Sequence, residues 1–190
     1  MTANQTSASL PSAGWPLMIG LGVTQIVSWG SIYYGFALLL EPLQRDLGAS
    51  RDAVAGAFSV ALLVSGLCAI RIGRTIDRIG GRSVMTFGSL AAALLLALLS
   101  RVESLPALYA VWAGLGAVMA ATLYEPAFAV IAKTFATGYR RALTVLTLFG
   151  GFASTVFWPL TTWLIERYGW RDAMLWLGLI NLVVCVPLHG

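Results

Sequence analysis

The chain contains six long apolar segments, and this feature limits what it can fold into more than any other. The segments cover residues 17–40, 53–70, 83–100, 105–132, 142–165 and 173–188. Five of them contain no Asp, Glu, Lys or Arg, and the fourth contains only Glu125. Segments of roughly this length can cross a bilayer as helices, and backbone groups in lipid must be paired within the helix. We therefore predict an all-α membrane protein with six transmembrane helices.

The composition agrees with a lipid environment and argues against other classes of protein. Hydrophobic residues make up 58% of the chain and charged residues only 11%, whereas soluble domains carry about 25% charged residues. Cys68 and Cys185 lie far apart without metal-ligand spacing, so we expect no metal and no other cofactor. The only histidine is His189, and the spans hold no paired carboxylates, which leaves no catalytic couple for an enzyme. No basic stripe with interleaved aromatic residues indicates nucleic-acid binding.

The distribution of Lys and Arg among the connections predicts the orientation in the membrane. These residues are favoured in short loops on the cytoplasmic side. The second and fourth connections hold seven of them, and the odd-numbered connections hold five. Residues 1–16 contain no Lys or Arg and therefore lack the cationic region of a signal peptide. We expect both termini on the cytoplasmic side of the cell membrane, inner or plasma, with residues 1–16 as a cytoplasmic tail.

A comparison of the chain with itself indicates an internal repeat. At an offset of 89 residues, the segment 76–85 lies on the segment 165–174 with five identities and one Asp/Glu exchange. The offset is close to half of the chain, and an odd number of spans per repeat inverts the second copy. We predict a six-helix domain over residues 17–188 that consists of two inverted three-helix repeats, at 17–100 and 105–188.

The connection between the second and third predicted spans, residues 73–82, carries the most specific motif. It reads Gly-Arg-Thr-Ile-Asp-Arg-Ile-Gly-Gly-Arg and resembles the G-x-x-x-D-R-x-G-R-R signature of the major facilitator superfamily. Glycines permit close helix approach and a tight reversal, whereas a plain cationic loop would not explain their spacing. The resemblance implies a charge relay that latches onto the second half of a transporter. The candidate gating residues are Gly73, Asp77, Arg78, Gly80, Gly81 and Arg82.

Two later segments resemble the monocarboxylate-porter and oxalate–formate-antiporter branch of that superfamily. They are the stretch from Tyr124-Glu125-Pro126 to Arg140-Arg141-Ala142, and Gly169-Trp170-Arg171. Members of the superfamily normally have twelve spans. The resemblance therefore implies that this chain is the N-terminal six-helix half of the fold, with the C-terminal half absent. The expected partners are the lipid bilayer, a small-molecule solute, and the missing half or a second copy.

Glu125 is the only ionisable residue well inside a predicted span. It lies about 12 Å along the helix from Lys133 at 1.5 Å per residue. An acidic residue in mid-helix costs roughly 3 kcal/mol on insertion, so we expect Glu125 to face a cavity or a partner, or to be protonated. Proton coupling or solute contact is one explanation, and a structural hydrogen bond is the alternative. Pro126 cannot donate to the carbonyl of Thr122, so a kink or a locally open backbone is expected beside it.

Polar and aromatic residues of other spans are candidates for the same path. Gln25, Trp29, Tyr33 and Phe36 share one face of the first span, at spacings of four, four and three residues. Contact with lipid or with the membrane interface is the alternative for the aromatic residues. Interhelical hydrogen bonding is the alternative for Asn181 in the sixth span. The candidate substrate or proton path comprises Glu125, Gln25, Tyr33, Tyr124 and Asn181.

Two functional hypotheses arise from these observations. In the first, the chain is the N-terminal half of a secondary transporter for a small organic solute and works by alternating access. The branch resemblance suggests a carboxylate as that solute, although no predicted span contains an arginine to bind one. In the second, the chain is a stand-alone six-helix membrane protein with a binding or accessory role.

Overall fold

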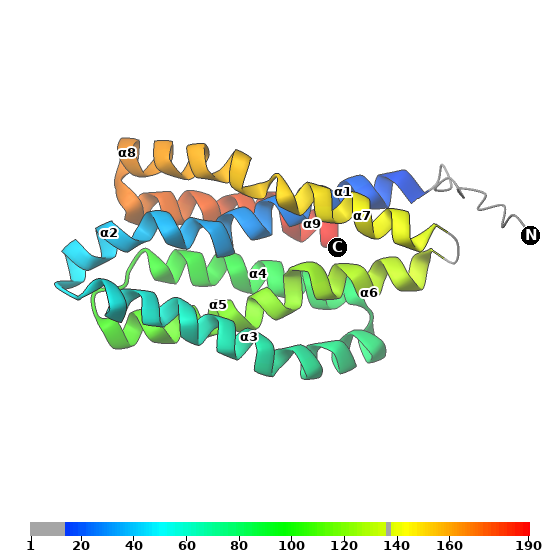
Figure 1. Cartoon of the computed structure of the whole chain (residues 1–190), viewed down its shortest axis with the longest axis horizontal. Coiled ribbons are helices and arrows are strands. Elements are labelled where there is room, and N and C mark those ends of the chain that lie inside the picture. The colour runs from blue at the N-terminus through cyan, green and yellow to red at the C-terminus, as the bar shows by residue number, and fades with distance from the viewer. Residues whose placement is uncertain (1–13, 136–137) are drawn as a thin grey trace, which may run out of the picture.

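The computed structural model describes residues 14–135 and 138–190, and all regular secondary structure in these ranges is helical (Figure 1). Most of the predicted tail, residues 1–13, lies outside the described residues. The elements are α1 (Trp15–Ser28), the π-helical turn η2 (Trp29–Tyr34), α2 (Gly35–Leu47), α3 (Arg51–Ile79), α4 (Gly81–Leu99), α5 (Leu105–Thr122), α6 (Tyr124–Thr134), α7 (Tyr139–Gly151), α8 (Ala153–Ile180), the π-helical turn η3 (Asn181–Cys185) and α9 (Val186–His189).

Five helical stretches in the described residues are long and apolar enough to cross a membrane. They are Trp15–Leu47, Arg51–Ile79, Gly81–Leu99, Leu105–Thr134 and Tyr139–His189. The fifth stretch has 51 residues, which corresponds to about 77 Å of helix at 1.5 Å per residue, more than twice the hydrocarbon thickness of about 30 Å. Within this stretch Gly169 leaves the helical conformation, with φ 82° and ψ 160°. Figure 1 shows that the chain reverses its direction within α8, near the label of this helix.

The connection predicted at residues 73–82 is helical almost throughout, which corrects the boundary of the second span. α3 continues to Ile79 and α4 begins at Gly81. Charged residues do not end a helix, and α3 therefore continues beyond its apolar part. Gly80 ends it with φ 88° and ψ 152°, a conformation that is essentially restricted to glycine. The reversal predicted for the glycine pair therefore takes place at Gly80 alone.

Small residues allow the helices to cross at short distance. A Cβ atom on Gly116 of α5 would lie 2.8 Å from the carbonyl carbon of Ala61 in α3. A Cβ atom on Gly178 of α8 would lie 2.9 Å from the carbonyl oxygen of Ala93 in α4. Glycine at such crossings is common in membrane proteins, because association there depends on close packing and not on the hydrophobic effect.

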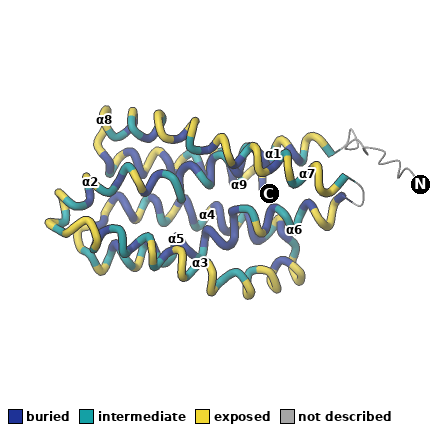
Figure 2. Tube along the Cα trace, in the orientation of Figure 1, coloured by how far each residue is buried: buried dark blue, intermediate teal, exposed yellow. Residues whose placement is uncertain are grey.

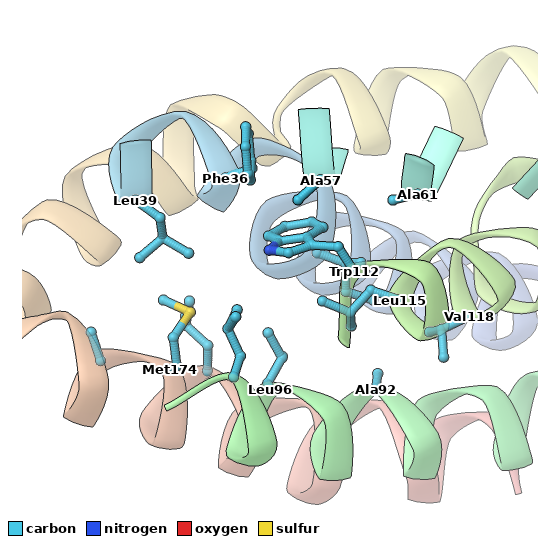
Figure 3. Packing of buried hydrophobic residues seen from close by; sticks show 14 of the residues in the cluster. Phe36, Leu39, Ala57, Ala61, Ala92, Leu96, Trp112, Leu115, Val118 and Met174 are labelled. Atoms are coloured by element: carbon cyan, nitrogen blue, oxygen red, sulfur yellow. The ribbon is translucent and has the colours of Figure 1, made fainter. Parts of the chain in front are cut away.

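The interior is apolar, and so is much of the surface. Trp112 is buried at the centre of the core beside Phe36 and Leu115 (Figure 3). Figure 2 shows that many helices have one buried and one exposed face. On α4 the exposed face consists of Phe87, Leu90, Leu94 and Leu98, which recur every three or four residues. An apolar stripe of this kind suits contact with lipid chains, in agreement with the predicted membrane environment.

At the end of the bundle that contains Gly169, polar contacts join neighbouring helices. The Trp170 Nε1 donates a hydrogen bond to Asp46 Oδ2 at 2.8 Å. The Arg171 guanidinium donates to the carbonyl oxygens of Ser100 and Val102, both at 2.9 Å. These bonds connect α2, the end of α4 and α8.

Candidate functional site

Three interruptions of regular helix lie on segments that contact one another. The first is the π-helical turn η2 after α1. The second is Leu123 between α5 and α6, whose φ of −81° and ψ of −150° are extended. The third is the junction of α7 and α8, which comes directly after the pair Gly150 and Gly151. The open backbone expected beside Pro126 is thereby confirmed, and it lies at Leu123, three residues before the proline.

Gln25 binds the backbone at the Leu123 interruption. Its Nε2 donates to the carbonyl oxygen of Thr122 at 2.9 Å and to that of Leu123 at 3.4 Å. Its Oε1 accepts a hydrogen bond from Trp29 Nε1 at 3.1 Å. The Gln25 side chain is fully buried, and buried carbonyl groups without a partner are destabilising. Gln25 therefore compensates for the hydrogen bonds that the broken helix leaves unmade.

Tyr124, the first residue of α6, connects the three interruptions. Its hydroxyl donates to the carbonyl oxygen of Thr147 in α7 at 3.2 Å. Its ring centroid lies 4.8 Å from that of Trp29 in η2. The ring also packs where a side chain on Gly150 would stand, since a Cβ atom there would come within 2.7 Å of Tyr124 Cζ. Glycine at position 150 is thus required for the observed position of the tyrosine.

Further aromatic rings extend this cluster along one side of the bundle. The ring of Tyr33 lies 5.0 Å from Trp29, and the ring of Phe128 stacks on Tyr124 at 5.3 Å. Tyr34 lies 6.1 Å from Trp29. Tyr34 also lines a cavity of about 470 Å³ together with Ser154, Thr155, Trp158 and Pro159 at the beginning of α8. These rings are partly exposed and can contact a molecule that enters from this side.

Glu125 lies beside Tyr124 in the first turn of α6 and is exposed. The next two residues, Pro126 and Ala127, are buried, so the carboxylate lies on the side of α6 that faces away from the bundle. Among the described residues we find neither a hydrogen bond nor an ion pair for this side chain. The structural hydrogen bond considered for Glu125 therefore has no counterpart in the described part of the chain.

The residues of the 73–82 motif form a second group at the opposite end from Gly169. Asp77 Oδ1 and Lys133 Nζ form an ion pair at 3.1 Å, and Lys133 Nζ also donates to the carbonyl oxygen of Ile76 at 3.3 Å. Both side chains of the pair are largely exposed, Lys133 by 53% and Asp77 by 75%. Gly81 packs against Val130 of α6. This arrangement connects the end of α3 with the end of α6.

The sequence of this chain matches the profile of the Major Facilitator Superfamily over residues 17–189. The chain belongs to this superfamily. It is a multi-pass membrane protein, and the superfamily predicted from the 73–82 motif is confirmed. The family match covers nearly the whole chain, including the aromatic cluster and Glu125.

The similar proteins include several transporters of one branch of the major facilitator superfamily. Monocarboxylate transporter 14 of Mus musculus is 32% identical over 180 residues, which are 90% of this chain and 33% of that protein. Monocarboxylate transporter 12 of Rattus norvegicus is 27% identical over 185 residues, which are 96% of this chain and 38% of that protein. The resemblance to the monocarboxylate-transporter branch is therefore confirmed. The chain spans little more than a third of the length of these relatives.

In this major facilitator protein the predicted path residues do not all lie together. Gln25, Tyr33, Tyr124 and Glu125 belong to the cluster around the Leu123 interruption. Asn181 is fully buried elsewhere, where its Nδ2 donates to Ser31 Oγ at 2.8 Å and to the carbonyl oxygen of Leu177. This geometry favours the alternative explanation for Asn181, which is an interhelical hydrogen bond.

The residues of the gating motif are similarly divided. A Cβ atom on Gly73 would meet no atom within 4 Å, so the close helix approach expected there is absent among the described residues. Arg78 and Arg82 are exposed at the ends of α3 and α4. Lys133, which binds Asp77, was outside the predicted group, because a pairing across 56 residues leaves no local sequence signal.

Tyr34, Phe128 and the cavity beside Tyr34 were not predicted from the sequence. Tyr34 does not share the helical face of Gln25 and Tyr33 in a regular α-helix. The π-helical turn η2 adds a residue to the turn and rotates the later side chains about the helix axis. Phe128 is four residues after Tyr124, so its position on the same face was accessible from spacing alone.

Proposed function

We propose that this chain is the N-terminal half of a secondary transporter that moves a small organic solute by alternating access. The chain forms six spans, as two inverted three-helix repeats at residues 17–100 and 105–188. A second six-helix unit, either a C-terminal half or a second copy, completes the solute path. Both termini are cytoplasmic, and the protein lies in the cell membrane.

Two glycines support the repeat and the count of six spans. Gly80 and Gly169 are 89 residues apart, the offset found in the sequence, and their backbone angles nearly coincide at φ 88°, ψ 152° and φ 82°, ψ 160°. At each of them one helix ends and the next begins in the opposite direction. Division of the stretch Tyr139–His189 at Gly169 gives two antiparallel segments and a total of six spans.

The interrupted helix at Tyr124 and Glu125 is the observation that carries the transport proposal. Discontinuous helices near the middle of the bilayer form the solute and ion sites of many secondary transporters. Here the interruption places an exposed carboxylate next to an aromatic cluster, about two thirds of the way along the candidate span Leu105–Thr134. An acidic group at this depth is functional by default, because lipid contact would be costly. We assign Gln25, Tyr33, Tyr124 and Glu125 to the solute or proton path.

The 73–82 motif is proposed to form the cytoplasmic gate. Gly80 sets the turn between α3 and α4, Gly81 begins α4, and Asp77 forms the ion pair with Lys133. Arg78 and Arg82 are available to bind the second unit. An ion pair between two exposed side chains contributes only about 0–1 kcal/mol. Asp77→Asn should therefore reduce uptake while the melting temperature stays within about 2 °C of the unmodified chain.

The names of the relatives suggest a carboxylate as the solute, and an uptake assay tests this together with the mechanism. Proteoliposomes would contain the complete product, meaning this chain together with its second six-helix unit, and a parallel sample would contain single 190-residue chains. We expect pH-dependent uptake of radiolabelled monocarboxylates or related small solutes only with the complete product. Glu125→Gln should abolish the pH dependence, and Glu41→Gln, at an exposed position in the middle of α2, should leave it intact. Uptake by Glu125→Gln that keeps the pH dependence of the unmodified protein would remove Glu125 from proton coupling.

A further inference from the structure

We propose that the site around Glu125 binds its solute through a positively charged ammonium group. The proposal rests on the proposed transport function and adds the chemical class of the group that is recognised. In this site the Glu125 carboxylate supplies the counter-charge, and the outer face of the neighbouring aromatic cluster borders the cation on one side. A carboxylate elsewhere on the solute is compatible with this arrangement.

The charge of Glu125 has no counterpart in the described residues. The 12 Lys and Arg residues of the chain all lie outside the six predicted apolar segments. Lys133, on the same helix, is eight residues away, or about 12 Å at 1.5 Å per residue, and it is paired with Asp77. An exposed carboxylate inside a span requires a cation, a proton or a water-filled cavity. A solute with a cationic group meets this requirement at the moment of binding.

The aromatic residues beside Glu125 are suited to the same group. Ammonium groups are attracted to the faces of Trp, Tyr and Phe rings when they lie within about 6 Å of the ring centroid. The rings of Trp29 and Tyr124 are 4.8 Å apart, and that of Phe128 is 5.3 Å from Tyr124. All three are partly exposed. The fold thus puts a lone carboxylate and three rings within the first turns of α6 and the adjoining part of η2.

The arrangement on α6 directs these groups to one side. Successive residues of an α-helix are rotated by about 100°, so Phe128 lies between Tyr124 and Glu125 around the helix axis. The opposite side of α6 is occupied by the buried residues Pro126 and Ala127. Tyr124 and Phe128 therefore border the exposed side on which Glu125 lies. An anionic group at this position would face Glu125 without a described cation to offset the repulsion.

Two small molecules of the same shape distinguish binding through a positive charge from binding through apolar contact alone. Choline carries a quaternary ammonium group, and 3,3-dimethylbutan-1-ol is its uncharged carbon isostere. Saturation-transfer NMR with the purified chain in detergent micelles would measure the dissociation constant of each, and of lactate as an anion. We expect choline to bind about three- to tenfold more tightly than the isostere, because a cation–π contact at a partly exposed site adds to an exposed ion pair.

Variants of the carboxylate test whether binding takes place at this site. Glu125→Gln should weaken choline binding about three- to fivefold, Glu125→Asp should retain most of it, and the control Glu41→Gln should bind as the unmodified chain does. Far-UV circular dichroism would confirm that each variant is folded. Equal binding of choline and its isostere, unchanged binding by Glu125→Gln, or a preference for lactate that depends on Glu125 would overturn the proposal.

The outcomes separate this proposal from the transport function. Uptake of an amine-free solute by the complete product, without choline binding, would refute the ammonium site and leave transport in place. Choline binding that depends on Glu125, without uptake of any solute by the complete product, would support the site and refute transport.

Discussion

Replacement of Gln25 by leucine should lower the free energy of unfolding by about 2 kcal/mol. The side chain donates to the carbonyls of Thr122 and Leu123 at 2.9 and 3.4 Å, and it accepts from Trp29 at 3.1 Å. Interhelical hydrogen bonds in membrane proteins contribute about 0.6 kcal/mol on average and at most about 1.7 kcal/mol. A buried polar group that loses its partner costs about 1–3 kcal/mol. Two well-formed bonds and one long bond therefore give the stated value.

The free thiols of the chain provide the assay. Cys185 is fully buried, and Cys68 is partly exposed. After Cys68→Ala, the reaction of a thiol-reactive fluorescent dye with Cys185 reports unfolding during heating in detergent. For a chain of this size about 2 kcal/mol corresponds to a decrease in melting temperature of about 4–8 °C.

Gln44 offers a matched control for the Gln25 substitution. Its Nε2 donates only to the carbonyl oxygen of Leu40 within α2, at 3.0 Å. Gln44→Leu removes one local bond and should lower the melting temperature by less than about 2 °C. If Gln25→Leu is no less stable than Gln44→Leu, the Gln25 bonds do not stabilise the interruption and the reasoning is refuted.

Three further predictions concern packing and helix ends. Gly116→Leu should prevent a monodisperse peak in size-exclusion chromatography, because its side chain would enter the backbone of α3. In the control Gly20→Leu, no atom lies within 4 Å of the Cβ position, so this variant should elute normally. Gly80→Ala and Gly169→Ala should each destabilise the chain by about 1–3 kcal/mol, because both positions have glycine-only backbone angles; a stable alanine variant at either position would contradict this. Arg171→Gln, which loses two hydrogen bonds of 2.9 Å, should lower the melting temperature by about 2–8 °C, and no change would show that these bonds contribute nothing.

The helical spans were predictable because their signal is local. An apolar segment between charges identifies a membrane helix from sequence alone. The predicted end of the second span, at residue 70, was wrong as the end of α3, because charged residues mark where the lipid ends and not where the helix ends. The motif residues from Gly73 to Ile79 are helical, and only the positive-φ glycine conformation at Gly80 stops the helix. Glycine spacing indicated the turn, but not which of the two glycines forms it.

The candidate site was predictable only in part. Pro126 cannot donate a backbone hydrogen bond, and the interruption expected from this appeared at Leu123. The residue that compensates for it could not be predicted, because Gln25 lies 97 residues from Thr122 and the contact depends on tertiary packing. The π-helical turn η2 contains no proline, and without such a signal a regular helix was the better expectation. The exposure of Glu125 is likewise set by which faces of α6 other helices cover.

The position of the interruptions explains why the site can combine order with an exposed charge. A continuous helix from α5 into α6 would need a hydrogen bond from residue 126, which proline cannot provide, so Pro126 favours a break here, although Pro42 and Pro159 lie inside α2 and α8 without one. Because Gln25 binds the free carbonyls, the break is stabilised by a side chain of α1. Tyr124 then anchors the start of α6 to α7 through Thr147, which leaves the next residue, Glu125, on the uncovered side. The start of α6 is thus fixed by neighbouring residues, while the Glu125 side chain has no hydrogen bond or ion pair within the described ranges.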